Sequence, residues 1–368
     1  MKILILGGTG AMGTPLTSIM ADRGHDVVVT SRKSRSSDRQ NVRYVQGNAK
    51  DYEFIKKETE AEGYDAIVDF MSYNTAEFAK RYEWMLNHTS QYIFISSARV
   101  FAECKGRIKE NSPRLLDVCT DEEYLKTDEY GLSKARQEDM LNNSGRTNWT
   151  IIRPSITYND YRLQMGAFDK EGWLYRALHG RSIVISKDVA DKKTAMTHGA
   201  DLTRVLANMI GKKEALARAF NIASEKSYTW LEILSFYLEV LEQETGKCPK
   251  VYIGEKSIKM KDGAKYQVMY ARSLNRSFDA TAIRQFADPD TFVDPKEGLQ
   301  TALRNFLKAP RFDRINWRHE AWNDIESGEI TPLSEIPSIG CKFEYLCYRH
   351  RLSFIYRTMR KVKNIIKK

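Results

Sequence analysis

Short apolar runs alternate with amphipathic segments along the first half of the chain. The run KILIL at residues 2–6 is followed by a glycine-rich stretch and a helical pattern that ends near Gly24. An apolar run of this length is typical of a strand that is buried on both faces of a parallel sheet. Further runs predict strands at residues 26–30, 42–47, 64–70, 91–96 and 148–154. Alternating units of this kind indicate an α/β protein with a Rossmann-type, doubly wound parallel sheet.

The pattern changes after Pro154. The segments that follow predict a smaller mixed α/β substrate lobe over residues 155–310, partly interleaved with the Rossmann domain of residues 1–154. Its predicted elements are helices at residues 171–179, 201–210 and 229–243 and strands at 182–186 and 219–224. Asp201 is expected to cap the second of these helices. Residues 311–368 are expected to form an appendage that ends in a basic helical tail.

Glycines separate the first predicted strand from the first predicted helix. Gly7, Gly10 and Gly13, with Ala11 and Met12 between the last two, stand where dinucleotide-binding folds have their phosphate loop. Glycines allow a tight turn and let the backbone approach a pyrophosphate, and the helix N-terminus that follows supplies N–H donors. We therefore expect these residues to bind a nicotinamide dinucleotide.

The residues after the second predicted strand bear on the choice of cofactor. An acidic residue there would bind the adenosine ribose hydroxyls and favour NAD, but the sequence has Ser31 and Arg32, followed by Lys33 and Arg35. Cations at this position suit a 2′-phosphate. The pattern favours NADP. One alternative is NAD. The other is that these residues form a solvated basic loop that does not discriminate between the two cofactors.

A tyrosine and a lysine four residues apart share one face of a helix. This spacing occurs three times, beginning at Tyr52, Tyr130 and Tyr252, but only Tyr130 follows a strand that ends in two serines, the second of which is Ser97. A free tyrosine has a pKa of about 10 and is a poor base at neutral pH, and a nearby ammonium favours its phenolate. Ser97, Tyr130 and Lys134 are therefore the candidate residues for proton transfer during hydride transfer at a sugar carbon.

Several motifs resemble, in order, those of the extended short-chain dehydrogenase/reductases, the NAD(P)-dependent epimerase/dehydratase family. The resemblance covers about residues 1–308 and rests on GGTGAMG, ISSARVF (95–101), YGLSK (130–134) and the pair Arg153-Pro154.

The resemblance assigns roles to residues of the predicted site. It implies that Ser97, Tyr130 and Lys134 are the catalytic residues and that Lys134 also holds the nicotinamide ribose. It adds Asn48 and Pro154 to the cofactor-binding residues, with Asn48 in place of the aspartate that usually meets the adenine.

The resemblance also implies an enzyme that acts on a nucleotide-activated sugar. Where the 4,6-dehydratases of the family have an acidic pair after the catalytic serine, this sequence has Ala98 and Arg99. An epimerase or a keto-sugar reductase is therefore favoured over a dehydratase. The charged insert at about residues 105–126 is expected to form a lid. The alternative is a non-catalytic protein of the same fold that binds a nucleotide or RNA, or senses redox state.

The predicted lobe offers polar residues for a nucleotide diphosphate. Tyr158, Arg162 and Lys193 are candidates, as is Arg181, and a surface role is the alternative for each cation. The five cysteines are scattered without a Cys-x-x-Cys pair, which indicates reduced thiols in the cytoplasm and no metal site.

The net charge is concentrated at the C-terminus. The whole chain carries +10, and residues 342–368 contribute nine basic residues and one acid, or +8. Apolar residues from Tyr348 to Ile366 recur every three or four positions, which predicts one basic amphipathic helix. Such a helix suits an anionic membrane surface, and the alternative is that it docks on the body or on the second subunit of a homodimer. Because the rest of the chain is nearly neutral, we expect no specific nucleic-acid binding.

Overall fold

The computed structural model describes residues 1–261 and 264–366 and divides into two compact units. The first unit contains Met1–Asn159, Thr194–Ser227 and Asn275–Gly298. The second contains Asp160–Lys193, Tyr228–Leu274 and Leu299–Lys368. The chain therefore passes between the units several times, and each unit is described by itself.

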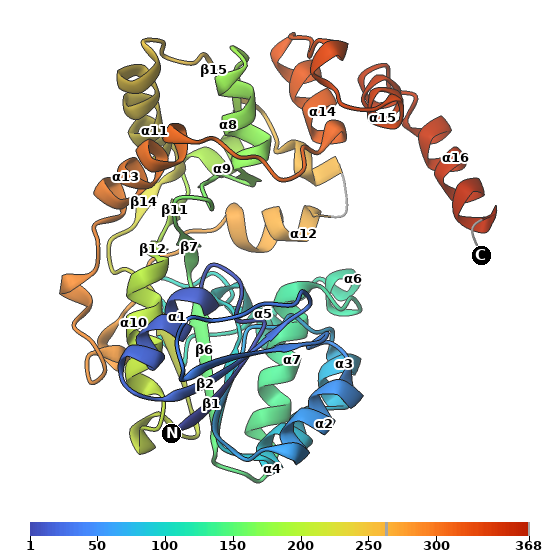
Figure 1. The fold of residues 1–368 in the computed structure, drawn as a ribbon. Helices are drawn as coiled ribbons and strands as arrows, with labels where there is room; N and C mark the ends of the chain where they lie inside the picture. Colours follow the sequence, from blue (N-terminus) through green and yellow to red (C-terminus); the bar gives the residue numbers. More distant parts are fainter. Residues whose placement is uncertain (262–263, 367–368) are drawn as a thin grey trace. The chain divides into compact units, whose positions relative to one another are not determined.

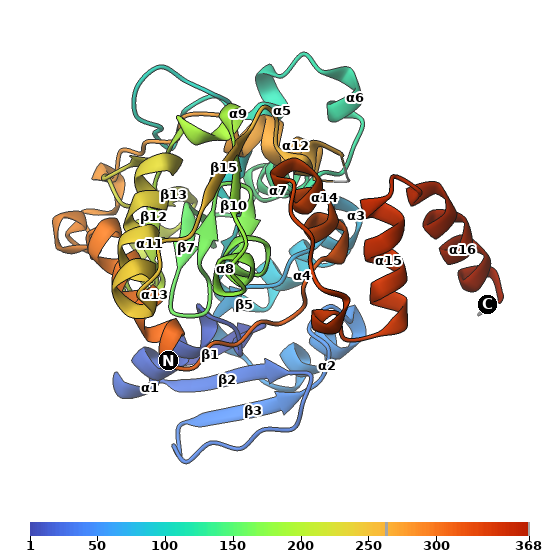
Figure 2. The same cartoon turned by 90° about the horizontal axis from the view of Figure 1, so that it is seen from above.

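The first unit is built on a parallel sheet of seven strands in the order β13-β6-β5-β4-β1-β2-β3 (Figures 1 and 2). This order confirms the predicted Rossmann-type fold, with the reversal of strand order between β1 and β4. The strands are β1 (Lys2–Leu6), β2 (Asp26–Ser31), β3 (Val42–Gln46), β4 (Tyr64–Asp69), β5 (Thr89–Ile95), β6 (Trp149–Pro154) and β13 (Arg218–Ile222).

Helices cover both faces of this sheet. Because side chains alternate along a strand, Ile3 and Ile5 pack into one apolar cluster with α1 and α10, while Leu4 and Leu6 pack into another with α2, α3, α4 and α7. The helices are α1 (Gly13–Asp22), α2 (Tyr52–Ala61), α3 (Thr75–Ala79), α4 (Tyr82–Asn87), α5 (Leu115–Val118), α6 (Glu122–Leu125), α7 (Tyr130–Asn142) and α10 (Gly199–Met209). A short parallel pair, β7 (Ile156–Tyr158) and β12 (Met196–His198), also belongs to this unit.

The N-cap of α10 is His198 and not the predicted Asp201. The helix begins at Gly199, two residues earlier than the apolar pattern suggests, and His198 Nδ1 accepts from the N–H of Ala200 at 3.3 Å. Asp201 therefore lies inside the first turn, where it accepts instead from the N–H of Val293 at 2.9 Å.

The second unit combines helices with short strands. Its strands are β8 (Gln164–Met165), β9 (Phe168–Asp169), β10 (Ile183–Ser186), β14 (Tyr228–Thr229) and β15 (Val251–Gly254). Its helices are α8 (Lys170–Leu178), α9 (Lys187–Ala190), α11 (Trp230–Thr245), α12 (Lys265–Gln267), α14 (Trp317–Ser327), α15 (Ile339–Arg349) and α16 (Ser353–Ile366). A boundary between the units falls inside β11 (Lys193–Thr194) and α13 (Pro295–Lys308).

Short 3-10 segments connect the longer elements. They are η1 (Ala98–Val100), η2 (Lys213–Ala215), η3 (Ile258–Lys261), η5 (Thr281–Ile283), η6 (Pro289–Thr291) and η7 (Leu333–Glu335), and η4 (Val268–Arg272) is a π-helical turn.

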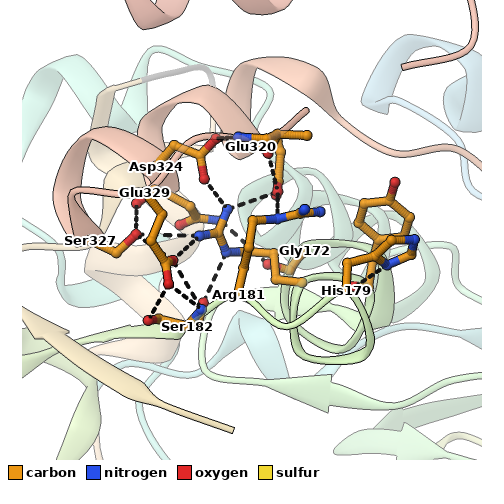
Figure 3. Close-up of polar contacts among 12 residues, drawn as sticks. Gly172, His179, Arg181, Ser182, Glu320, Asp324, Ser327 and Glu329 are labelled. Atoms are coloured by element: carbon orange, nitrogen blue, oxygen red, sulfur yellow. Dashed lines mark hydrogen bonds and ion pairs between the residues drawn. The ribbon is translucent and has the colours of Figure 1, made fainter. Parts of the chain in front are cut away.

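A buried cluster of charges joins α8 to the C-terminal part of the second unit (Figure 3). Arg176 on α8 is fully buried and pairs with Glu320 and Asp324 on α14, each at 2.8 Å, and with Glu329 at 2.9 Å. Arg181 also pairs with Glu320, at 3.1 Å. Residues 311–335 are thus attached to the second unit by ionic contacts as well as by apolar packing.

Most carboxylate oxygens of this cluster have partners besides the arginines. Burial opposes the ionisation of Asp324, but hydrogen bonds from Tyr345 and Arg176 lower its pKa below the usual value. Tyr345 donates to Asp324 at 2.6 Å, and this bond ties α15 to α14. For Glu320 the effect of burial is larger than that of the two arginines, so its pKa is raised above the usual value.

The C-terminal segment forms two helices, and the prediction of one continuous helix is wrong. Arg351 has a left-handed φ of 60°, and the N–H of Leu352 donates to the carbonyl oxygen of Cys347 at 2.7 Å. This bond is the signature of a Schellman motif, which ends α15 and turns the chain before α16 begins. Tyr348 packs edge-on against Trp322 in the second unit and so leaves the predicted stripe. Lys367 and Lys368 lie outside the described residues.

Replacing Arg176 with methionine should destabilise the second unit by about 3–5 kcal/mol, because Asp324 and Glu329 would lose their buried counter-charge. Arg304→Met is the matched control, since Arg304 and Glu244 form a partly exposed pair at 3.5 Å. The control should cost less than about 1 kcal/mol. Hydrogen exchange of the α14 and α15 amides measures both effects. Equal loss of protection in the two variants would contradict the role given to the cluster.

Candidate functional site

The glycine loop joins β1 to α1 and leaves no room for a side chain at Gly13. Gly7 has a left-handed φ of 70°, and its N–H donates to Thr30 Oγ1 at 3.0 Å. A Cβ atom on Gly13 would lie 2.4 Å from the Cα atom of Gly8. Because α1 follows directly, and the first N–H groups of a helix have no intrahelical acceptor, the loop fits the pyrophosphate of a dinucleotide. The other predicted residues of this loop are Gly10, Ala11 and Met12.

The other predicted cofactor residues lie at or after the carboxyl ends of strands. Ser31 ends β2 and is buried, and its Oγ accepts from the N–H two residues later at 3.3 Å. Arg32 follows and is exposed. Asn48 follows β3, and its Oδ1 accepts from the N–H two residues later at 3.1 Å. Pro154 ends β6. Ser31 and Asn48 thus shape turns, while the side chain of Arg32 extends into solvent at the same edge of the sheet.

The start of α7 approaches η1 closely. Ser97 precedes η1, and its Oγ accepts from the N–H of Arg99 at 3.2 Å. Tyr130 is the first residue of α7 and is 38% exposed. A Cβ atom on Gly131 would lie 2.8 Å from the carbonyl oxygen of Arg99, so glycine is needed for this approach. The contact holds the first turn of α7 against the segment that carries Ser97.

Lys134 lies one turn further along α7 and is buried. Its Nζ donates to the carbonyl oxygen of Ile95, the last residue of β5, at 2.8 Å. The same atom lies 6.0 Å from the centroid of the Tyr130 ring. Burial lowers the pKa of Lys134 to about 8, although the charges of Asp69 and Glu138 act in the opposite direction. The lysine beside Tyr130 therefore exchanges its proton much closer to neutral pH than a free lysine does.

Glu138, a further turn along α7, fixes the helix to the sheet. Its side chain is fully buried and accepts from Ser96 Oγ at 2.5 Å and from Arg153 Nε and Nη2 at 2.8 and 2.7 Å. Ser96 follows β5 and Arg153 lies in β6, so one carboxylate joins α7 to the carboxyl ends of two strands. Charge-assisted bonds of this kind are strong and directional.

Asp69 is a site residue that the sequence analysis did not select. It ends β4 and is fully buried, where it accepts from Tyr92 Oη at 2.8 Å and from the N–H of Met71 at 2.9 Å. Burial raises the pKa of this carboxyl group. The signal in the sequence is a single acid near the end of the apolar run YDAIVDF.

The predicted substrate residues have different environments. Tyr158 is buried in the first unit, where a Cβ atom on Gly298 would lie 1.9 Å from its hydroxyl oxygen. Burial raises the pKa of this tyrosine. Arg162 and Lys193 are exposed residues of the second unit. The guanidinium of Arg181 is buried in the charge cluster, so its charge is already balanced by carboxylates.

The insert at residues 105–126 contains α5 and α6 and is attached to the first unit near its start. Ile108 forms a parallel bridge with Phe278, and the carbonyl oxygen of Glu110 accepts from Arg153 Nη1 at 2.7 Å. The same arginine that pairs with Glu138 therefore holds the insert. That the insert acts as a lid stays a prediction.

No metal-binding group is found in the described part of the chain, that is, no set of three or more His, Cys, Asp or Glu side chains arranged around one point. Over the same residues, no helix combines the length and the apolar character needed to cross a membrane.

The family described as NAD(P)H-binding matches residues 7–191, which is half of the chain. The matched range contains the glycine loop from Gly7 onwards, together with Ser97, Tyr130 and Lys134. With the seven-stranded parallel sheet, this match confirms the predicted dinucleotide-binding domain of Rossmann type.

Curated proteins give one extended match and one short match. The chain is 28% identical over 244 residues to the chloroplast stem-loop binding protein of 41 kDa b of Arabidopsis thaliana, a match that covers 62% of this chain and 60% of that protein. It is 41% identical over 46 residues to an epimerase family protein of Bacillus subtilis, or 12% of this chain and 15% of that protein. The chain thus matches less than two thirds of the length of these relatives.

Solved structures of sugar-nucleotide enzymes share the fold. A UDP-glucose 4-epimerase of Thermus thermophilus in complex with NAD has a TM-score of 0.61 at 16% identity, over 84% of this chain and 100% of that chain. A dTDP-glucose 4,6-dehydratase of Bacillus anthracis in complex with NAD has a TM-score of 0.64 at 16% identity, over 84% and 97%. The TM-scores establish a common fold, and at identities this low the similarity extends no further than the fold.

Replacing Gly13 with alanine should weaken dinucleotide binding, because the new methyl group would meet the backbone of Gly8 and displace the loop. Gly63→Ala is the matched control, since a Cβ atom there meets nothing within 4 Å. Titration of each purified variant with NADPH, followed by nicotinamide fluorescence, measures the effect. We expect at least about a tenfold loss of affinity for Gly13→Ala, equivalent to about 1.4 kcal/mol, and no change for the control. Unchanged binding by both would exclude this loop as the phosphate site.

Proposed function

Because the chain belongs to the NAD(P)H-binding family, we propose that it is an enzyme that epimerises or reduces a nucleotide-activated sugar with a nicotinamide dinucleotide. The shared fold of the sugar-nucleotide epimerases and dehydratases supports the reaction class. Ala98 and Arg99, which follow Ser97, provide no acidic pair for the loss of water, and this favours an epimerase or a keto-reductase.

One observation carries this proposal: Tyr130 and Lys134 lie on the first turns of a helix that is fixed to the carboxyl ends of β5 and β6. Ligands of doubly wound sheets bind at these strand ends. Lys134 is buried beside Tyr130 with its Nζ on the last carbonyl of β5, while Tyr130 stays accessible. A structural pair on a solvated helix would have both side chains in water.

Each residue of the site has a distinct task in the proposed reaction. Tyr130 would take the proton from a sugar hydroxyl, or return it to a keto-sugar, at its phenol oxygen. Ser97 would orient the same oxygen of the sugar through its hydroxyl. Lys134 would stabilise the phenolate by its charge and would bind the nicotinamide ribose. A bound nicotinamide supplies hydride acceptance and donation, which no side chain can perform.

NADP is the proposed cofactor. No acid follows β2, and the side chain of Arg32 is exposed at the carboxyl end of that strand, where it would bind a 2′-phosphate. The glycine loop would hold the pyrophosphate through the N-terminus of α1. NAD remains the alternative, since the solved structures of similar fold hold NAD.

A second candidate function is recognition of RNA. The observation that favours it is the Arabidopsis relative, whose name describes stem-loop binding and which matches 62% of this chain. A binding protein of this fold would not need the proton-transfer residues. The two functions therefore differ in what a conservative change at Tyr130 does.

We also propose that α16 lies on an anionic membrane surface. Phe354, Met359 and Val362 are exposed on this helix by 63%, 55% and 49%, although they are large apolar residues. Arg357 and Arg360 are also exposed, and residues 345–368 contain no acid. An apolar face beside a purely basic one is the pattern of an interfacial helix.

Removing the hydroxyl of Tyr130 should stop the reaction and leave cofactor binding intact. Purified wild-type protein is first denatured, and the small molecules that it releases are identified by mass spectrometry. Hydride exchange between labelled NADPH and a panel of sugar nucleotides is then measured for the wild type and Tyr130→Phe. We expect at least about a hundredfold loss, because general acid–base catalysis contributes at least this much. Tyr252→Phe, at a second Tyr-x-x-x-Lys site, is the control with full activity.

Unchanged exchange in Tyr130→Phe would contradict the catalytic assignment. A wild-type protein that holds and binds neither cofactor, but retards a stem-loop RNA in a gel, would favour the RNA-binding function instead.

Acidic substitutions on α16 should detach the protein from anionic vesicles. Co-sedimentation with phosphatidylcholine vesicles that contain phosphatidylglycerol is compared for the wild type and the double variant Met359→Glu, Val362→Glu. We expect at least about a tenfold loss of bound protein, and weaker binding of the wild type at high salt. Ile339→Glu is the matched control, since Ile339 is 86% exposed on α15. Wild-type protein that stays in solution and sediments as a dimer would support docking on a second subunit instead.

A further inference from the structure

Arg99 places a second positive charge close to the ring of Tyr130. Arg99 belongs to η1, and its guanidinium carbon is 5.1 Å from the centroid of the Tyr130 ring. The side chain is mostly buried, with 22% exposure, and forms an ion pair with Glu129. Two cations, Arg99 and Lys134, therefore lie within about 6 Å of one ring, a range at which a cation acts on an aromatic face.

Glu129 holds Arg99 in this position. Glu129 caps α7 by accepting from the N–H of Gly131 at 2.8 Å, and it also accepts from Tyr124 Oη at 3.3 Å. Its carboxylate is thus fixed by the helix that begins with Tyr130. The close approach of Gly131 to the carbonyl oxygen of Arg99 fixes the backbone on the other side. Arg99 is therefore positioned from both ends and has little freedom to turn away.

The two cations differ in the range of pH over which they stay charged. Burial lowers the pKa of Lys134 to about 8, so its ammonium is lost as the pH rises through that value. A guanidinium remains protonated over this whole range. Only Arg99 can then maintain a positive charge beside the phenol at alkaline pH.

We infer that Arg99 is a positioning residue of this site, which acts through Tyr130 by favouring its ionised form, while Glu129 holds Arg99 in place and offsets part of its charge. This inference rests on the proposed function, since it gives the base of that reaction a second cation. The charged groups near Tyr130 include Arg99 from η1, Lys134 from α7, and Glu129, which is the N-cap of α7 and pairs with Arg99. Arg276 is also buried, and the charge of Arg99 acts on it.

The inference is tested on the ionisation of Tyr130 itself. The full chain is labelled with tyrosine enriched in carbon-13 at Cζ, and the Tyr130 resonance is assigned by its absence in Tyr130→Phe. The midpoint of its titration is then compared among variants. Arg99→Gln should raise the midpoint by about one pH unit, because a cation about 5 Å away is lost from a partly buried site. Arg99→Lys should restore part of the difference, since it returns the charge without the planar guanidinium.

A variant of opposite sign separates electrostatics from loss of structure. Glu129→Gln removes the negative charge and keeps a hydrogen-bond acceptor for the cap, so it should lower the midpoint. Arg136→Gln is the control, because Arg136 lies on α7 and pairs with Asp128 at 3.3 Å. We expect its midpoint to stay within about 0.2 units of the wild type.

Two results would overturn the inference. One is a midpoint in Arg99→Gln that equals that of the wild type. The other is a shift in the same direction for Arg99→Gln and Glu129→Gln, which would mean that both act through a general disturbance of the fold. Neither result depends on a substrate, so a failure here is distinct from a failure of the proposed enzyme, which is decided by Tyr130→Phe and cofactor binding.

Discussion

The buried bond between Glu138 and Arg153 is the constraint on which the candidate site depends. Arg153 reaches Glu138 through two nitrogen atoms, and Ser96 donates to the same carboxylate. Removing one partner would leave a buried charge without compensation, which is far more costly than the loss of a surface pair. Because Glu138 and Tyr130 share α7, this bond also fixes where Tyr130 and Lys134 lie relative to the carboxyl ends of β5 and β6.

Within the candidate site, Lys134 is buried whereas Tyr130 is exposed, and this difference suits the separate roles proposed for them. Lys134 is enclosed, so burial shifts its proton affinity and Asp69 and Glu138 balance its charge. Tyr130, the first residue of α7, remains exposed. A base that must meet a sugar has to be accessible, whereas the cation that supports it acts most strongly where water is excluded. The proposed role of Arg99 adds a second, mostly buried cation beside the same ring.

The second unit also contains buried ion pairs, which here join distant segments of the chain. Arg176 and its carboxylate partners join segments that are about 150 residues apart in the sequence. The arginines hold together α8 and the residues after 311, which carry the basic end of the chain. The C-terminal region is therefore integrated with the second unit as far as α15. On α16 the exposed apolar side chains Phe354, Met359 and Val362 are the ones that the proposed membrane contact uses.

The sequence by itself determined the fold of the first unit and pointed to the candidate residues for catalysis and cofactor binding. Continuous apolar runs and a glycine loop after the first strand allow few other interpretations, because both reflect local backbone geometry and burial. The tertiary structure decided which polar residues meet. The effect of the Asp69 charge on Lys134, the position of Arg99 beside Tyr130 and that of Arg181 inside a carboxylate cluster depend on the approach of distant segments, which local spacing does not encode. The break at Arg351 also escaped the sequence pattern, because a non-glycine residue in a left-handed conformation leaves the apolar spacing on either side unchanged.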